Sequence, residues 1–131
     1  MKNKERKTID RRRLTQFNLS ENNRLTYIYD YSVKRLCMEI VCVSLEIKIK
    51  NDWVTILRYD NHHDGVLHRH TLIAYSNTAD IVDYNGTKRK GNFTKLLNWA
   101  IGDIQSNFMI YKRKFLNRNH LLLKGVEVDE Y

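Results

Sequence analysis

Histidines are concentrated in one short segment of this sequence. Four of the five lie between residues 62 and 70, in the string YDNHHDGVLHRH that begins at Tyr59. Arg58 and Asp60 flank Tyr59, and Arg69 lies inside the segment. Imidazole is the side chain that exchanges protons near neutral pH without help from its surroundings. The segment therefore holds the residue types that proton transfer beside a charged substrate group requires.

The spacing of these residues predicts that some of them share a surface. His68 and His70 are two residues apart in a predicted strand, so both side chains point to one face, about 7 Å apart. Arg58 and Asp60 share a parity at the end of the preceding strand. If the two strands pair antiparallel, we expect these four side chains to converge, with His62 or His63 above them.

One interpretation of the cluster is general acid and base catalysis without a metal. Cleavage of a phosphodiester by the RNA 2′-OH needs a base, an acid and a cation over the phosphate. His68 and His70 would supply the base and the acid, assisted by His63 or His62. Arg58 and Arg69 would stabilise the phosphorane, and Asp60 would orient a histidine. This interpretation requires no cofactor.

Two other interpretations stay open. A divalent metal ion is the first alternative, because histidine and carboxylate ligands suit zinc, iron or manganese. Its ligands would be His63, His68, His70 and Asp60. In the second alternative the histidines are exposed polar residues of a long hairpin without chemistry, and Asp60 starts a turn.

The positive charge of the chain is unevenly distributed. The formal net charge is +8; residues 1–13 contribute +5 and residues 84–119 contribute +7, around a slightly acidic body. Clustered cations supply affinity for nucleic acids through phosphate contacts. The predicted contacts to RNA are Arg11, Arg12, Arg13, Lys88, Arg89, Lys90, Lys112 and Arg113. A binding module without catalysis is compatible with the same charges.

The centre of the chain predicts antiparallel strands. The chain has no proline, so its turns are expected at Asn51-Asp52, Asp64-Gly65 and Asn85-Gly86. From residue 37 to 49 apolar residues alternate with polar ones, and Val41 is among the apolar positions. Further strands are expected over residues 53–59, 66–75 and 79–85, and a possible one over residues 25–33. In that last strand Tyr27, Tyr29 and Tyr31 share a face, where they either pack under a helix or stack on bases.

A long helix is expected after Gly91. Its apolar residues recur at helical spacing, and Asn92 is the predicted N-cap. The apolar stripe consists of Phe93, Leu97, Ala100, Ile104, Phe108, Tyr111 and Phe115. The predicted fold class is α+β, with an antiparallel sheet of about four or five strands and this helix packed across one face. We expect a basic arm over residues 1–24, one domain over 25–118 and a tail over 119–131.

Two further observations concern the compartment. Cys37 and Cys42 are five positions apart in a predicted strand, an odd spacing that points their side chains to opposite faces, so they are expected to remain unbridged and buried. The N-terminus lacks an apolar signal region, and no stretch reaches the roughly 18 apolar residues of a membrane span. We therefore expect a cytoplasmic protein without a membrane partner. A homodimer is left open.

The sequence also resembles a known group of proteins. The string WVTILRYDNHHDGVLHRH, from Trp53 to His70, and the later string AIGDIQSNFMIYKRKF, from Ala100 to Phe115, resemble the small TumE-like toxins of prokaryotic toxin-antitoxin systems. The resemblance covers about residues 40–118. Its motif positions are Arg58, Tyr59, Asp60, Asn61, His63, His68 and His70, then Asp103, Asn107, Tyr111 and Phe115.

The resemblance implies a toxin that acts as an RNA-cleaving enzyme and is silenced by a cognate antitoxin protein. The N-terminal arm and the C-terminal tail lie outside it, and the pair His62-His63 leaves the register of the loop histidine open. Asp103 and Asn107 are four residues apart on the predicted helix, where they are expected to bond to each other or to reach toward the sheet.

Overall fold

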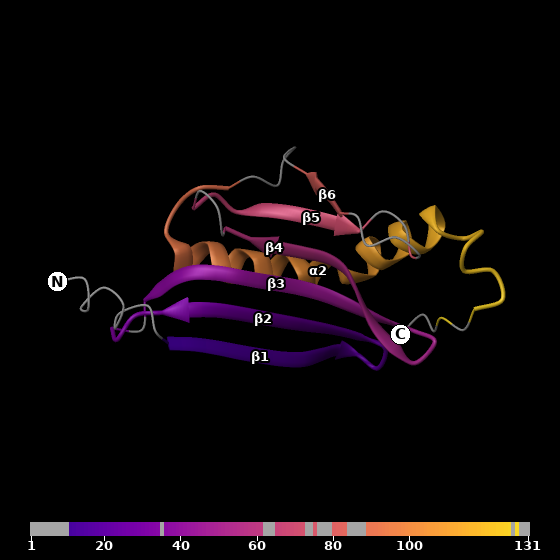
Figure 1. The fold of residues 1–131 in the computed structure, drawn as a ribbon, viewed down its shortest axis with the longest axis horizontal. Coiled ribbons are helices and arrows are strands. Elements are labelled where there is room, and N and C mark those ends of the chain that lie inside the picture. The colour runs from indigo at the N-terminus through magenta and orange to yellow at the C-terminus, as the bar shows by residue number, and fades with distance from the viewer. Residues whose placement is uncertain are drawn as a thin grey trace.

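The protein folds as one antiparallel sheet with a long helix on one face (Figure 1). The computed structural model describes residues 11–34, 36–61, 65–72, 75, 80–83, 89–126 and 128. Within this part the sheet has six strands in sequential order. They are β1 (Arg11–Ser20), β2 (Asn23–Tyr31), β3 (Cys37–Ile49), β4 (Asp52–Asp60), β5 (His68–Leu72) and β6 (Asp80–Asp83), followed by α2 (Phe93–Arg118). The predicted α+β fold is confirmed.

The longest strand, β3, supplies much of the core. Val43, Leu45 and Ile47 are fully buried, as the alternating pattern predicts. The parity changes nearer the start of the strand, because a bulge shifts the β2 register from Ile28 opposite Cys42 to Tyr29 opposite Ile40. Ile40 is therefore fully buried. Val41, expected on the core face, is only half-buried.

The turn between β3 and β4 is a tight two-residue reversal. Ile49 pairs with Asp52, so Lys50 and Asn51 form the turn. Their φ angles are 52° and 66°, and two consecutive positive φ values are what a type I′ hairpin turn needs. The reversal thus lies one residue before the predicted Asn51-Asp52.

The helix α2 begins where the sequence predicts and covers the middle of the sheet. The side chain of Asn92 accepts a hydrogen bond from the Lys95 backbone N–H at 3.1 Å, which confirms the N-cap. The helix packs mainly on β3 and reaches β2 and β4 at its edges. Buried helix residues that join the core include Leu96, Leu97, Ala100, Ile104 and Phe115.

The structure corrects the expected N-terminal and C-terminal boundaries. Residues 11–20, expected to belong to an arm, form the edge strand β1, which pairs with β2 from end to end. Residues 1–10 lie outside the described part of the chain. At the other end Leu123 belongs to the core, and Val126 and Val128 pack against it. The tail is therefore part of the domain at least as far as Val128.

None of the helices in the described ranges is long and apolar enough to cross a membrane.

The N-cap gives a test of the helix start. Replacing Asn92 by Ala removes the acceptor for the Lys95 N–H, so we expect the free energy of unfolding to fall by about 1 kcal/mol. Urea denaturation measures the change. Asn92→Asp keeps an acceptor oxygen and is expected to match the parent protein. A loss of the same size in both variants would contradict this description of the helix start.

Candidate active site

One face of the sheet is covered by α2 and the other is not, and the strand register shows to which face each side chain points. Arg58 lies opposite His70, and Asp60 lies opposite His68, on the paired strands β4 and β5. Directly opposed residues in an antiparallel pair point to the same face. Tyr59 lies between Arg58 and Asp60 in sequence and points to the other face, where it is fully buried. The histidines of β5 therefore share the face that α2 leaves open.

On this open face Asp60 is the centre of a compact polar cluster. Its Oδ2 lies 3.1 Å from His70 Nε2 and 3.8 Å from Arg58 Nε. The side chains of Asp60 and His70 are 10% and 16% exposed, whereas that of Arg58 is 40% exposed. His68, opposite Asp60, is buried. The convergence predicted for these four residues is confirmed, and so is the contact of Asp60 with a histidine.

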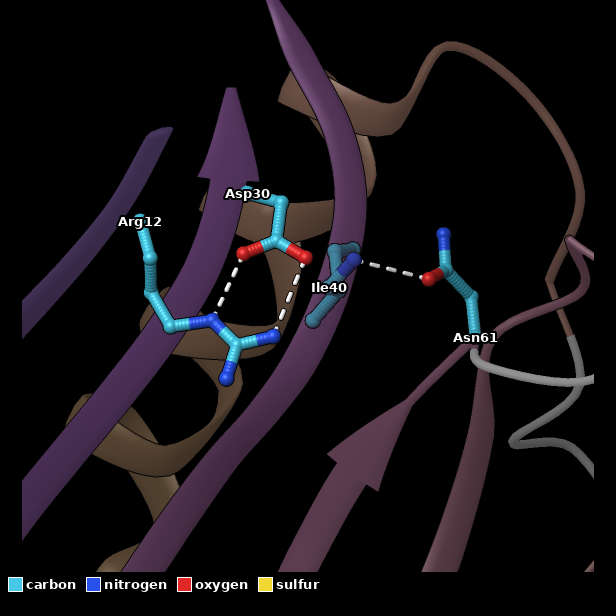
Figure 2. Close-up of polar contacts among 4 residues, drawn as sticks. All are labelled: Arg12, Asp30, Ile40 and Asn61. Atoms are coloured by element: carbon cyan, nitrogen blue, oxygen red, sulfur yellow. Dashed lines mark hydrogen bonds and ion pairs between the residues drawn. The ribbon is translucent and has the colours of Figure 1, made fainter. Parts of the chain in front are cut away.

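Asn61 fixes the end of β4 against β3. Its Oδ1 accepts a hydrogen bond from the Ile40 backbone N–H at 2.8 Å, as Figure 2 shows. Its own backbone N–H donates to the Ile40 carbonyl at 3.3 Å. Because Asn61 follows Asp60 directly and is almost fully buried, these bonds hold the backbone that carries the cluster carboxylate. Asn61 is a position of the sequence motif, but the sequence alone indicates no role for it.

Arg69 does not belong to this cluster, contrary to the sequence prediction. It lies opposite Tyr59 and so points to the helix side of the sheet. There its Nη1 donates to the Tyr111 hydroxyl at 3.2 Å, and the guanidinium lies 5.4 Å from the centre of the Tyr111 ring. Arg69 alternates with His68 and His70 along a strand, so the sheet itself separates it from them.

A second polar network joins α2 to the helix side of the sheet. The hydroxyls of Tyr59 and Tyr111 each donate to Asp103 Oδ2 at 2.6 Å. Asn107 Nδ2 donates to Asp103 Oδ1 at 3.0 Å. Asp103 and Asn107 therefore bond to each other, and Asp103 also reaches the sheet, as the sequence analysis allowed. This network joins the two sequence motifs into one structural unit.

The pKa values of the two tyrosines in this network are raised. Burial, with the nearby Asp103 carboxylate as the second cause, raises the pKa of Tyr59 strongly. The same two causes raise the pKa of Tyr111. A negative charge on either ring is disfavoured because it would lie beside a carboxylate in a desolvated place. Both tyrosines act as hydrogen-bond donors to Asp103.

The two cysteines are free thiols. Burial raises the pKa of Cys37 to about 11 and also raises that of Cys42. A thiolate is the reactive form of cysteine. Neither residue is therefore suited to act as a nucleophile.

The residues predicted to contact RNA differ in burial and in their interaction partners. Lys112 is buried at 1% exposure, so it is not a surface contact. It lies three residues before the buried Phe115, on the same side of α2. Arg12 forms a two-point ion pair with Asp30 (Figure 2), and Arg89 lies 3.9 Å from the centre of the Trp99 ring. Arg11, Arg13, Lys90 and Arg113 are exposed.

Three predicted residues lie outside the described part of the chain: His62, His63 and Lys88. Within the part that is described, no three His, Cys, Asp or Glu side chains are arranged to hold a metal ion. The alternative metal site proposed from the sequence therefore depends on a loop histidine at position 62 or 63.

Comparison with known proteins adds one relationship. A family model described as "Domain of unknown function (DUF7718)" matches residues 2–121. The chain belongs to this family. The DUF7718 match begins before β1 and ends after α2, so it includes the N-terminal residues that the sequence analysis placed outside the core. Searches of curated proteins and of solved structures found no match.

The tyrosine network predicts a loss of stability in alkali. Above about pH 10 the unfolded chain releases tyrosine protons that the folded protein retains, so the unfolded state binds fewer protons and the free energy of unfolding falls as pH rises. Below about pH 10 the tyrosines are protonated in both states, so their contribution to the free energy of unfolding is fully present. In Tyr59→Phe we expect this fall to be shallower by up to about 1.4 kcal/mol per pH unit.

Urea denaturation at a series of pH values from 8 upward measures the effect. The variant also loses the bond to Asp103, which lowers its stability at all pH values, so the slope and not the absolute value is compared. Parallel curves for the parent and Tyr59→Phe would contradict the raised pKa.

Proposed function

We propose that this protein is a metal-independent endoribonuclease that acts as the toxin of a toxin-antitoxin system. The observation that carries the proposal is the contact of His70 Nε2 with Asp60 Oδ2 at 3.1 Å, beside Arg58 and His68 on the sheet face opposite α2. An imidazole held by a carboxylate is a common arrangement for a general base. The resemblance of the RYDN and HRH strings to TumE-like toxins supports the same function.

The proposed reaction is transesterification by the RNA 2′-hydroxyl. His70 accepts the 2′-OH proton, and Asp60 stabilises the charge that forms on the imidazole ring. The 2′ oxygen bonds to phosphorus while the bond from phosphorus to the 5′ oxygen breaks. His68, or a loop histidine at position 62 or 63, donates the proton that the leaving 5′ oxygen takes up. The products are a 2′,3′-cyclic phosphate and a 5′-hydroxyl.

Arg58 is the cation proposed to stabilise the phosphorane. It is the most exposed member of the cluster and adjoins Asp60 on the face where substrate would lie. Preorganised positive charge at the site where negative charge develops is among the largest contributions to catalysis of this kind. Arg69, which points to the opposite face, has no part in the proposed step.

The proposal is tested with labelled RNA in buffer that contains EDTA. We expect cleavage that yields a cyclic phosphate end. The rate is expected to fall about a hundredfold or more in His70→Ala and at least tenfold in Asp60→Asn, which retains the shape of the side chain. Substrate with a 2′-deoxy nucleotide at the cut site should resist cleavage.

Asp30→Asn is the matched control, because Asp30 is also an ion-paired aspartate on the open face but lies away from the histidines. Its cleavage rate is expected to equal that of the parent protein. Activity that disappears in EDTA and returns with one divalent metal would favour the metal alternative. Absence of cleavage at every salt concentration would leave no support for a ribonuclease.

A further inference from the structure

The outer part of the helix side of the sheet carries a tyrosine ladder. Tyr27, Tyr29 and Tyr31 follow one another at alternate positions on β2. The rings of Tyr27 and Tyr29 are stacked, with centroids 6.1 Å apart and an interplanar angle of 10°. The ring of Tyr31 follows with a centroid 5.9 Å from that of Tyr29. All three residues are half-buried, so each keeps part of its surface exposed to solvent.

The helix lies mainly over the strand next to this ladder. α2 packs chiefly on β3 and less extensively on β2. Tyr27 and Tyr29 pack against the core from the side, which agrees in part with the expectation of an aromatic stripe under the helix. Figure 1 shows β1 as the outermost strand, on the far side of β2 from the helix. The residues of β1 on the helix side of the sheet therefore lie next to the tyrosine ladder, at the edge of the sheet.

Two arginines of β1 stand beside the ladder. Arg11 lies opposite Tyr31, and Arg13 lies opposite Tyr29, so each guanidinium shares a face with a tyrosine ring. Both arginines are exposed. Arg12, between them in sequence, points to the other face, where Asp30 accepts two hydrogen bonds from its guanidinium at 2.7 and 3.1 Å. Of three consecutive arginines, Arg12 is thus ion-paired on one sheet face, and Arg11 and Arg13 lie on the other face with the tyrosines.

We propose that the tyrosine ladder, with Arg11 and Arg13, is a binding site for single-stranded nucleic acid, separate from the histidine cluster. Aromatic rings repeated along a strand offer stacking surfaces for successive unpaired bases, and adjacent cations contact the phosphates. The helix-side residues of β1 and β2 include no acid, so the surface is positive. A base-paired duplex keeps its bases stacked inside and cannot use the rings.

The site is tested by fluorescence anisotropy with a labelled deoxythymidine strand of about 12 nucleotides. DNA lacks the 2′-hydroxyl, so the proposed cleavage cannot occur and binding is measured alone. We expect the single strand to bind at least tenfold more tightly than a duplex of equal length. Tyr31→Ala and Tyr29→Ala should each weaken binding about tenfold, whereas Tyr31→Phe and Tyr29→Phe should not. Tyr31 is the primary test, because Tyr29 also packs on the core.

The arginines provide variants matched in charge. Arg11→Ala and Arg13→Ala should each reduce the slope of log affinity against log salt by about 0.7, the value for one phosphate contact on a single strand. Arg12→Ala removes the same charge from the opposite face and should leave the slope unchanged. Equal effects of all three substitutions, or equal affinity for single strand and duplex, would overturn the proposal.

The same assay distinguishes nucleic acid from acidic protein as the ligand of this surface. If polyglutamate competes as well as unlabelled deoxythymidine strand at equal charge, the surface recognises acidic protein and the proposal is wrong. Because the ladder and the histidine cluster lie on opposite faces, loss of binding in Tyr31→Ala together with intact cleavage would separate this site from the proposed enzyme activity.

Discussion

The antiparallel register of β4 against β5 is the constraint on which the site depends. Side chains alternate between the two faces of a strand, so a slip of one residue would send His68 and His70 to the helix side and Arg69 to the open face. The core fixes the register. Tyr59 is fully buried on the helix side, and the cluster residues on either side of it must then point to the open face. The placement of the polar groups that we propose as catalytic therefore follows from the burial of the Tyr59 ring on the other face.

The Asp103 network strengthens this arrangement from behind the sheet. Its two tyrosine hydroxyls come from β4 and from α2 and meet one carboxylate. Charged acceptors make stronger hydrogen bonds than neutral ones. Asn61 adds a connection from the end of β4 to β3. Asp60 is therefore held between a ring bonded to the helix and an amide bonded to the next strand, which is the kind of support that a precise proton-transfer geometry requires.

Much of the fold could be predicted from periodicity alone. The helix stripe and the alternation in β3 are strong patterns, and the parity of Arg58, Asp60, His68 and His70 was sufficient to predict their convergence. β1 is difficult to predict because its sequence, RRRLTQFNLS, begins with three charges and has few apolar residues. An edge strand with little burial shows only weak alternation. β1 joins the sheet through backbone pairing with β2, and this pairing does not produce a clear pattern of side-chain types.

Other errors have different physical origins. Arg69 lies between the two histidines in sequence, but its parity in the strand places it on the opposite face. The charges next to Lys112 predict that it is exposed, but its side chain is buried on the same side of the helix as Phe115. The shift of parity at Val41 comes from a bulge, and bulges of this type are determined by how two strands meet. The sequence of β3 alone therefore does not predict this bulge.

The position of β1 at the edge of the sheet also bears on how copies of the protein meet. In the sheet as described, one side of β1 pairs with β2 and no strand pairs with its other side. An open edge of ten residues is a template to which another extended chain can add. Charge at such an edge discourages strands that carry like charge. The arginines at the start of β1 therefore disfavour pairing of this edge with basic extended segments.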